Sequence, residues 1–241
     1  MSGSQYIALS GLRARVDELD RLASDIANVG TSGYKGERDT KAAAEREAFD
    51  ATLQTAIDTT FGGRRLDMTT GALAPTGRAL DVAIDGPGFF VISTPGGARY
   101  TRNGHFTVNG DRKLITEDGA EVQGDDGKAI TLSDDGEFHV DSDGTIWSGT
   151  TKSGQLAVVT FRDPSQLEHE TGARLRADGQ TATPVKTAVV RGGSLEQSNV
   201  SIADRIAELT TVSRGFEALQ KAISMLMNEV DGRAIDHLGR R

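Results

Sequence analysis

The chain has 241 residues, a formal net charge of -8, 26% charged residues and no cysteine. A chain of this length can bury one large or two modest hydrophobic cores. The acidic balance argues against nucleic acid and anionic membrane surfaces as partners, because both bind clustered Lys and Arg. Without cysteine, disulfides, thiolate nucleophiles and Cys-ligated zinc sites are excluded.

The N-terminal segment has the spacing of an amphipathic helix. Its apolar residues recur at alternating steps of three and four, which places them in one stripe along a helix. Charged residues such as Arg13 and Glu18 occupy the other faces, and Gly30 and Gly33 provide the stop. The predicted stripe consists of Leu9, Leu12, Val16, Leu19, Ala23 and Ile26.

The interior of the chain has the turn signals that separate short strands. All five prolines lie there, and Asn-Gly and Asp-Gly pairs, which favour hairpin turns, separate short apolar runs. We therefore predict a central antiparallel β domain over residues 76–184, as a barrel or a sandwich. Residues 34–75 and 185–197 are predicted to form a connecting arm or linker. The predicted strands cover residues 80–85, 88–93, 98–101, 105–109, 113–116, 129–133, 137–141, 145–148 and 155–162.

The C-terminal segment repeats the helical spacing in steps of four and three. For either end taken alone, a helix packed on its own globular core is the alternative. A matched pair instead favours an α+β fold in which long N- and C-terminal helices, residues 1–33 and 198–241, form a coiled-coil domain. The C-terminal stripe consists of Val212, Phe216, Leu219, Ile223, Leu226 and Val230, with Ile202, Ile206 and Leu209 upstream.

The sequence shows no pattern typical of a catalytic or metal-binding site. Its four histidines are too far apart in sequence to pair at helical spacing. The run from Asp141 to Thr145 resembles the start of a calcium loop, but Lys152 stands where an EF-hand requires a bidentate Glu. We interpret the run as a surface turn, and we predict that the protein is not an enzyme and needs no cofactor.

The two terminal helices favour a structural subunit that polymerises, and two other classes of protein are the alternatives. A β-rich hydrolase with helical extensions would need convergent titratable groups, and the spacing selects none. A secreted β-rich binding module would need a signal or anchor, and the start of the chain lacks the apolar core of a secretory signal. No apolar run approaches the roughly 20 residues of a membrane-spanning helix, so we predict no membrane insertion.

Six short runs in four regions, in order along the chain, resemble signatures of the flagellar rod and hook protein family. The first run departs from the family just upstream, where Ser24 and Asp25 replace two usual asparagines. Residues 68–73 and 228–234 resemble proximal-rod members, with distal-rod members as the alternative. The runs are IANV and TSGYK at 26–29 and 31–35, DVAIDGPGFFV and YTRNGHF at 81–91 and 100–106, GSLEQSNV at 193–200, and RGFE at 214–217.

The resemblance implies a structural subunit of the flagellar basal-body rod that polymerises helically and transmits torque from motor to hook. It implies a periplasmic position and export by the flagellar type III apparatus without a cleaved signal peptide. Expected partners are copies of the chain, other rod proteins and that apparatus, and we expect both termini to order on assembly. Asn28, Gly33 and Asn199 would turn the chain out of and into the helices. The predicted assembly interface comprises these three with Leu9, Leu12, Val16, Leu19, Ile26, Ile206, Leu209, Val212, Phe216, Leu219, Ile223 and Leu226.

Overall fold

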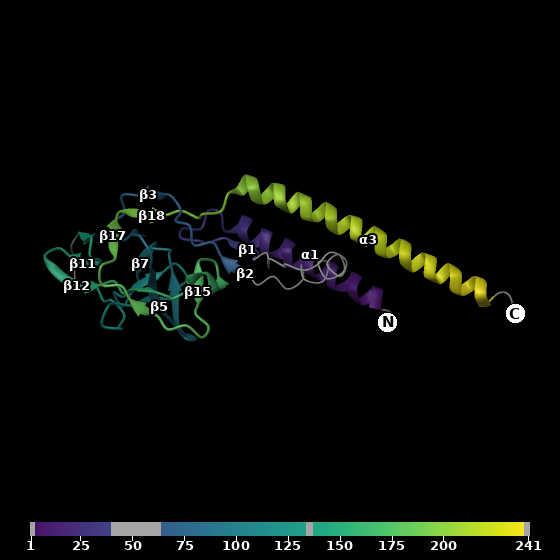
Figure 1. The fold of residues 1–241 in the computed structure, drawn as a ribbon. Coiled ribbons are helices and arrows are strands. Elements are labelled where there is room, and N and C mark those ends of the chain that lie inside the picture. Colours follow the sequence, from purple (N-terminus) through teal and green to yellow (C-terminus); the bar gives the residue numbers. More distant parts are fainter. Residues whose placement is uncertain (1–2, 40–63, 134–136, 239–241) are drawn as a thin grey trace. The chain divides into compact units, whose positions relative to one another are not determined.

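The computed structural model describes residues 3–39, 64–133 and 137–238 (Figure 1). The chain divides into two compact units, which we call the helical unit and the β unit. The helical unit takes Met1–Ala27, Asp39–Arg64 and Ser201–Arg241, and the β unit takes Asn28–Arg38 and Arg65–Val200. Each unit is therefore assembled from segments that are distant in the sequence.

Within the described residues, an α-helix at each end of the chain flanks a long series of short strands. The helices are α1 (Gly3–Ala27) and α3 (Ile202–Leu238), and a 3-10 turn, η1, spans Pro164–Gln166. The strands are β1 (Glu37–Asp39), β2 (Arg64–Leu66), β3 (Leu73–Pro75), β4 (Val82–Asp85), β5 (Phe89–Thr94), β6 (Gly97–Thr101), β7 (Phe106–Val108), β8 (Leu114–Thr116), β9 (Glu121–Val122), β10 (Phe138–Val140), β11 (Thr145–Ser148), β12 (Thr151–Gln155), β13 (Val158–Thr160), β14 (Glu168–Thr171), β15 (Arg174–Arg176), β16 (Thr183–Pro184), β17 (Val189–Gly192) and β18 (Ser194–Glu196).

The predicted fold class, α+β with a coiled-coil domain of terminal helices, is wrong. The described part of the chain is predominantly β, and the N-terminal helix is the shorter of the two, with 25 residues against 37. The predicted stripe on α1 is also not a buried seam. Val16 of that stripe is 40% exposed, whereas Leu22, which lies outside it, is 0% exposed.

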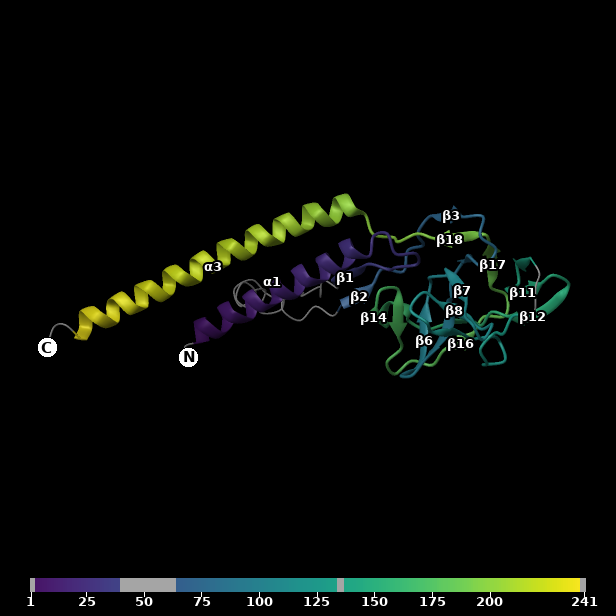
Figure 2. The ribbon, with the colours of Figure 1, turned by 180° about the vertical axis from the view of Figure 1, so that it is seen from behind.

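The orientation of α1 explains this difference. The two helices lie side by side and antiparallel in the helical unit (Figure 2). Across them, Arg21 contacts Glu208 and Asp25 contacts Arg205. Val16 precedes Asp25 by nine residues, and at about 100° per residue the two side chains lie on opposite sides of α1. The apolar stripe of α1 therefore faces away from α3, so the two predicted stripes do not meet as a coiled coil requires.

The β unit is built around a nine-stranded sheet of antiparallel pairs. Its main path runs β14-β15-β6-β5-β9-β8-β7, with β13 pairing with both β5 and β16. A separate three-stranded sheet has the order β10-β11-β12. Strands β17 and β18, from the C-terminal side of the chain, pair with β4 and β3. These two pairings bring the segment that precedes α3 back onto strands from the first half of the chain.

Two hydrophobic clusters form the core of the β unit, one on each side of β5. Phe90 and Ile92 belong to the first cluster, and Phe89 and Val91 belong to the second. Phe90 packs edge-on against Phe106, with 5.3 Å between the ring centroids. Side chains alternate across a strand with a period of two, so a strand that is apolar at every position is buried on both faces.

Strands β4 to β8 coincide with predicted segments to within two residues at each end. The predicted strand at 129–133 forms only isolated bridges, and residues 185–197, predicted as linker, contain β17 and β18. Of the predicted arm at 34–75, residues 40–63 lie outside the described residues. The proposed domain boundaries stay a prediction.

The carboxylates of the calcium-like run from Asp141 to Thr145 bind groups of their own hairpin. Asp143 accepts hydrogen bonds from the Thr145 amide at 2.9 Å and the Thr145 hydroxyl at 3.0 Å. These bonds lower the pKa of the Asp143 carboxyl. Asp141 accepts from Trp147 Nε1 at 2.7 Å. Both carboxylates are thus used by the hairpin between β10 and β11, which fits the interpretation as a surface turn.

Candidate functional site

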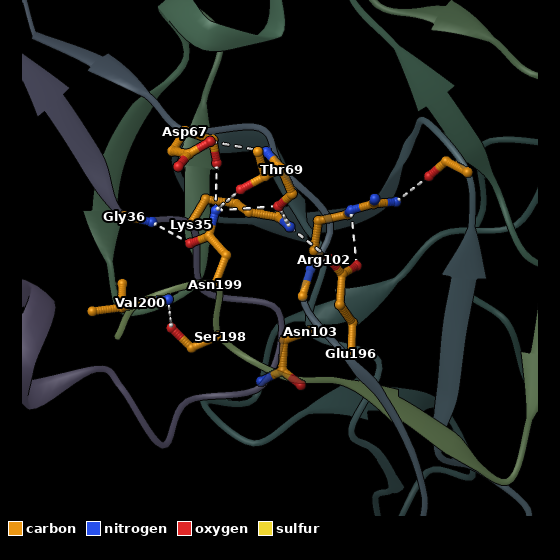
Figure 3. A network of polar contacts seen from close by, with 12 residues as sticks. Lys35, Gly36, Asp67, Thr69, Arg102, Asn103, Glu196, Ser198, Asn199 and Val200 are labelled. Atoms are coloured by element: carbon orange, nitrogen blue, oxygen red, sulfur yellow. Dashed lines mark hydrogen bonds and ion pairs between the residues drawn. The ribbon is translucent and has the colours of Figure 1, made fainter. Parts of the chain in front are cut away.

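Separate segments of the β unit meet at one buried polar cluster (Figure 3). We call Lys35, Arg102, Glu196 and Asn199 the junction cluster. Its three charged members are each at most 3% exposed. Along the chain, Lys35 follows α1, whereas Glu196 and Asn199 precede α3. The cluster therefore joins the two segments that connect the β unit to the helices.

Lys35 and Glu196 form a fully buried ion pair. Lys35 Nζ donates to Glu196 Oε1 at 2.5 Å and to the carbonyl oxygen of Thr69 at 2.8 Å. The amide of Gly71 donates to the same carboxylate oxygen at 3.0 Å. Burial lowers the pKa of Lys35, and the bond to Glu196 opposes that shift. The pair ties the segment after α1 to β18 and to the loop at 67–71.

Arg102 brings a second cation to the same carboxylate. Its Nε lies 3.1 Å from Glu196 Oε2, and its Nη1 donates to the carbonyl oxygen of Gly86 at 2.8 Å. The guanidinium carbon lies 5.9 Å from the centre of the Phe89 ring, within range of a cation–π interaction. Burial lowers the pKa of Arg102, and the charge of Glu196 opposes that shift. One carboxylate thus balances two buried cations, with the carbonyls of Thr69 and Gly86 as further acceptors.

The Asn199 side-chain amide holds two other segments by their main chains. Its Oδ1 accepts from the Gly36 amide at 2.8 Å. Its Nδ2 donates to the carbonyl oxygens of Asp67 at 2.8 Å and Thr69 at 3.1 Å. The contacts need a donor and an acceptor on one short side chain, which an amide supplies and a carboxylate does not.

Two glycines allow the segments around the cluster to approach closely. Gly33 has a φ of 68°, and its amide donates to the Glu196 carbonyl oxygen at 2.7 Å. A Cβ at Gly33 would lie 2.2 Å from the carbonyl carbon of Arg102, and one at Gly71 would lie 1.9 Å from the carbonyl oxygen of Gln197. Any side chain at either position would force the backbones apart.

An aromatic stack and a short turn flank the cluster. The Tyr34 ring stacks on His169 with 4.7 Å between centroids and an interplanar angle of 12°. His169 Nε2 lies 2.7 Å from the carbonyl oxygen of Lys35. Upstream, the Thr31 amide donates to the Asn28 carbonyl at 3.0 Å, and the Thr31 hydroxyl donates to Asn28 Oδ1 at 3.1 Å. The segment from 28 to 36 is therefore stabilised by a local turn and by the contacts of Tyr34 and Lys35 with His169.

Comparisons with known proteins identify the class to which this arrangement belongs. Residues 83–148 match the flagellar hook protein FlgE/F/G D1 domain, and residues 191–235 match the flagellar basal body rod FlgEFG protein C-terminal family. The flagellar basal-body rod protein FlgF of Caulobacter vibrioides is 33% identical over 245 residues, which cover 100% of this chain and 99% of that protein. The chain belongs to the flagellar basal-body rod protein family.

Within the family, the likeness favours FlgF over FlgG. FlgF of Rhizobium meliloti is 31% identical over 245 residues, covering 99% of each chain. FlgG of Bacillus subtilis is 32% identical over 251 residues, covering 93% of this chain and 95% of that protein. The FlgF matches extend further along both chains. The resemblance seen in the sequence is thus confirmed, and the chain is a structural rod subunit of the flagellar basal body. Among the described residues, neither helix is long and apolar enough to cross a membrane.

The predicted interface residues are divided between the two units of this rod protein. Asn28, Gly33 and Asn199 lie in the β unit, in or beside the junction cluster. The others lie on α1 and α3, where Val212 is buried and Ile206 is 50% exposed. The side chains of Leu9 and Leu226 lie outside the described residues. A role for the set in assembly stays a prediction.

Sequence reasoning missed the three charged members of the junction cluster. Lys35, Arg102 and Glu196 all lie inside the runs that carry the family resemblance, at 31–35, 100–106 and 193–200. Each was treated as part of a signature and not as a charge that needs a partner. The available signal was one charged residue in each of three segments that otherwise consist of small, polar and apolar residues, with two positive charges and one negative charge among them.

Proposed function

We propose that this subunit polymerises helically in the proximal rod and transmits torque from the motor to the hook, using apolar residues on the outer sides of its helices to contact neighbouring subunits. The orientation of α1 carries this proposal. Its stripe, which includes Leu12, Val16 and Leu19, faces away from α3, and Val16 is 40% exposed. A helix normally buries its apolar stripe against another element. In the rod, a neighbouring subunit supplies that element.

The start of α3 offers a second apolar surface. Ile202 and Ile206 are 49% and 50% exposed, and their spacing of four residues places them on one face. Leu209 extends that face by one more turn. When one surface of a subunit binds a different surface of the next copy, and the rotation does not close a ring, the result is a helical polymer. The surfaces on α1 and α3 provide two such different patches.

The junction cluster supports the part of the proposal that concerns torque. A load on the helices is passed along the chain to residues 33–36 and 196–199. These segments are linked to each other by the Lys35–Glu196 ion pair and by the Asn199 amide. Separating a buried ion pair leaves an uncompensated charge in the interior, which is strongly unfavourable. The cluster therefore resists extraction of either segment from the β unit.

Substitution of Val16 tests the proposed contact. The variant Val16→Asp should abolish swimming in soft agar and leave basal bodies with a truncated axial structure, while the purified chain keeps the circular dichroism of the wild type. The matched control Arg13→Asp places the same carboxylate at another exposed position of α1, and it should swim. Normal swimming of the Val16 variant would show that the α1 stripe is not an assembly surface.

A distal-rod subunit is the second candidate, favoured by the 32% identity to FlgG of Bacillus subtilis. Imaging of basal bodies from a deletion strain separates the two candidates. For a proximal-rod subunit the axial structure should stop close to the motor. If a rod of nearly full length remains, the chain belongs to the distal part.

We also infer that the subunit assembles with copies of itself and with other rod proteins. We infer further that it reaches the periplasm through the flagellar export apparatus without cleavage. Family membership supports these inferences. The intact mass of the protein from purified basal bodies tests the export route, because it should equal the mass of the complete translated chain. A mass that is lower by the mass of a signal peptide would contradict export without cleavage.

A further inference from the structure

Four charged side chains form a closed ring between α1 and α3, and we call them the helix quartet. Across the helices, Arg21 Nη2 lies 3.3 Å from Glu208 Oε1, and Arg205 Nε lies 2.9 Å from Asp25 Oδ2. Along the helices, Arg21 Nη1 lies 3.8 Å from Asp25 Oδ2, and Arg205 Nη1 lies 2.7 Å from Glu208 Oε2. The signs alternate around the ring, so each neighbouring pair is attractive.

Burial of its two α1 members makes this ring unusual for a helix surface, whereas the side chains of Arg205 and Glu208 are 18% and 38% exposed. The side chains of Arg21 and Asp25 are only 3% and 1% exposed. Desolvation of buried charges is costly, so such a ring adds little net stability compared with apolar packing. Buried polar groups can instead select one alignment of two helices over others, as a buried polar residue does at a helix interface.

The apolar residues of α3 select the alignment only weakly. Val212, Phe216, Leu219 and Ile223 follow one another at steps of about one turn. If α3 slides by three residues along α1, Phe216 moves to the place of Leu219, or Leu219 to that of Phe216, and the other apolar side chains come within one residue of a neighbour's place. The packing surface therefore looks similar in the native register and in registers displaced by one turn.

The quartet, in contrast, penalises a slip in either direction. A slip of three residues one way moves Glu208 to the place of Arg205, where it faces Asp25. A slip the other way moves Arg205 to the place of Glu208, where it faces Arg21. Both displaced registers bring like charges together in a buried site, which is repulsive at short range. We propose that the helix quartet fixes the axial register of α1 against α3.

Cysteine pairs can report the register, because the natural chain contains no cysteine. A Cβ at Gly11 would lie 3.8 Å from Leu219 Cδ2. Gly11→Cys with Leu219→Cys therefore reports the native register. Gly11→Cys with Phe216→Cys, or with Ala222→Cys, reports a slip of three residues in each direction. Disulfide formation within the purified full-length chain is followed by its shift in mobility on a non-reducing gel.

With the natural quartet, the native pair should oxidise at least about tenfold faster than either slipped pair, because like charges oppose the slipped registers. The swap Asp25→Arg with Arg205→Glu keeps opposite charges across the helices in the native register. It also makes both slipped registers attractive. In one, the arginine introduced by Asp25→Arg meets Glu208. In the other, the glutamate introduced by Arg205→Glu meets Arg21. The preference for the native pair should fall to about threefold or less.

Reversal of all four charges tests whether the alternation of sign around the quartet sets the register, whichever sign each position carries. Arg21→Glu, Asp25→Arg, Arg205→Glu and Glu208→Arg together restore alternating signs, and the preference for the native pair should return. Circular dichroism confirms that each variant remains helical. The milder pair Asp25→Asn with Arg205→Gln repeats the test with smaller changes, and the slipped disulfides should again increase. If the swap and the neutral pair both keep the full native preference, or if the natural chain shows none, the quartet does not set the register.

Discussion

Glu196 Oε1 lies 2.5 Å from Lys35 Nζ, and both side chains are 0% exposed. The second oxygen of the same carboxylate lies 3.1 Å from Arg102 Nε. One anion therefore compensates two buried cations that come from distant parts of the chain. The stability of the junction cluster depends on this carboxylate more than on either of its partners.

Glu196→Gln should lower the free energy of unfolding by about 3–5 kcal/mol, because it leaves two buried cations without a counter-charge. Equilibrium urea unfolding of the full chain, followed by the fluorescence of its one tryptophan, measures the effect. The control is Glu168→Gln, which removes a pair with Arg176 in which both side chains are about half exposed. That change should cost less than about 1 kcal/mol. Equal costs for the two variants would mean that the cluster is not the critical joint.

Gly33→Ala should destabilise the chain by at least about 2 kcal/mol, because an L-residue at φ 68° is strained and its Cβ meets the Arg102 backbone. Gly30→Ala is the matched control, since a Cβ at Gly30 has no atom within 4 Å. The control should change stability by no more than about 0.5 kcal/mol. Thermal unfolding of both variants measures the difference. A Gly33 variant as stable as the control would contradict the close approach described here.

Asn199→Asp should cost about 1–3 kcal/mol, because a carboxylate cannot donate to the carbonyl oxygens of Asp67 and Thr69. Exchange of the Gly71 amide should accelerate as the loop at 67–71 loosens. The control is Asn109→Asp, because Asn109 Oδ1 only accepts, from the amides of Asp111 and Lys113, and a carboxylate keeps both bonds. Similar exchange rates in the two variants would rule out a clamping role for Asn199.

Asp163 should make stability depend on pH only under strongly acidic conditions. Hydrogen bonds from Ser165 and Gln166, and then Arg65, lower its pKa from 3.8 to about 2. A depressed carboxyl pKa favours the folded state above the unfolded pKa, and that contribution is lost as pH falls through the folded pKa. The stability difference between the wild type and Asp163→Asn should therefore shrink between pH 3.8 and about 2. An NMR titration that places this carboxyl near 3.8 would disprove the assignment.

The strands were predictable because their signals are local. A few neighbouring residues are enough to recognise an Asn-Gly or Asp-Gly turn, or the continuous apolar run of β5. Phe89 and Phe90 of that run lie in clusters on opposite sides of the strand. The junction cluster was not predictable in this way. Lys35 and Glu196 are 161 residues apart, and nothing in either neighbourhood specifies the other. Strands β17 and β18 were read as linker for the same reason, because their partners lie more than a hundred residues earlier.

The face of α1 that packs against α3 was not predicted, because hydrophobicity alone defined the predicted stripe. Arg21 and Asp25 are buried together with Leu22, and their partners on α3 make that burial possible. The departure at position 25, where the family usually has asparagine, was the available clue. A carboxylate that is buried at this position needs a compensating cation, and Arg205 supplies it.

The Asn199 amide binds main-chain atoms of Gly36, Asp67 and Thr69, and every residue type except proline presents such atoms in the same way. Side chains at the exposed tip of this loop can therefore be exchanged without loss of the contact. Thr70 is exposed there, and Thr70→Cys would introduce the only thiol into the chain. A dye attached at this position should therefore leave the contacts of Asn199, and the folding of the chain, unchanged.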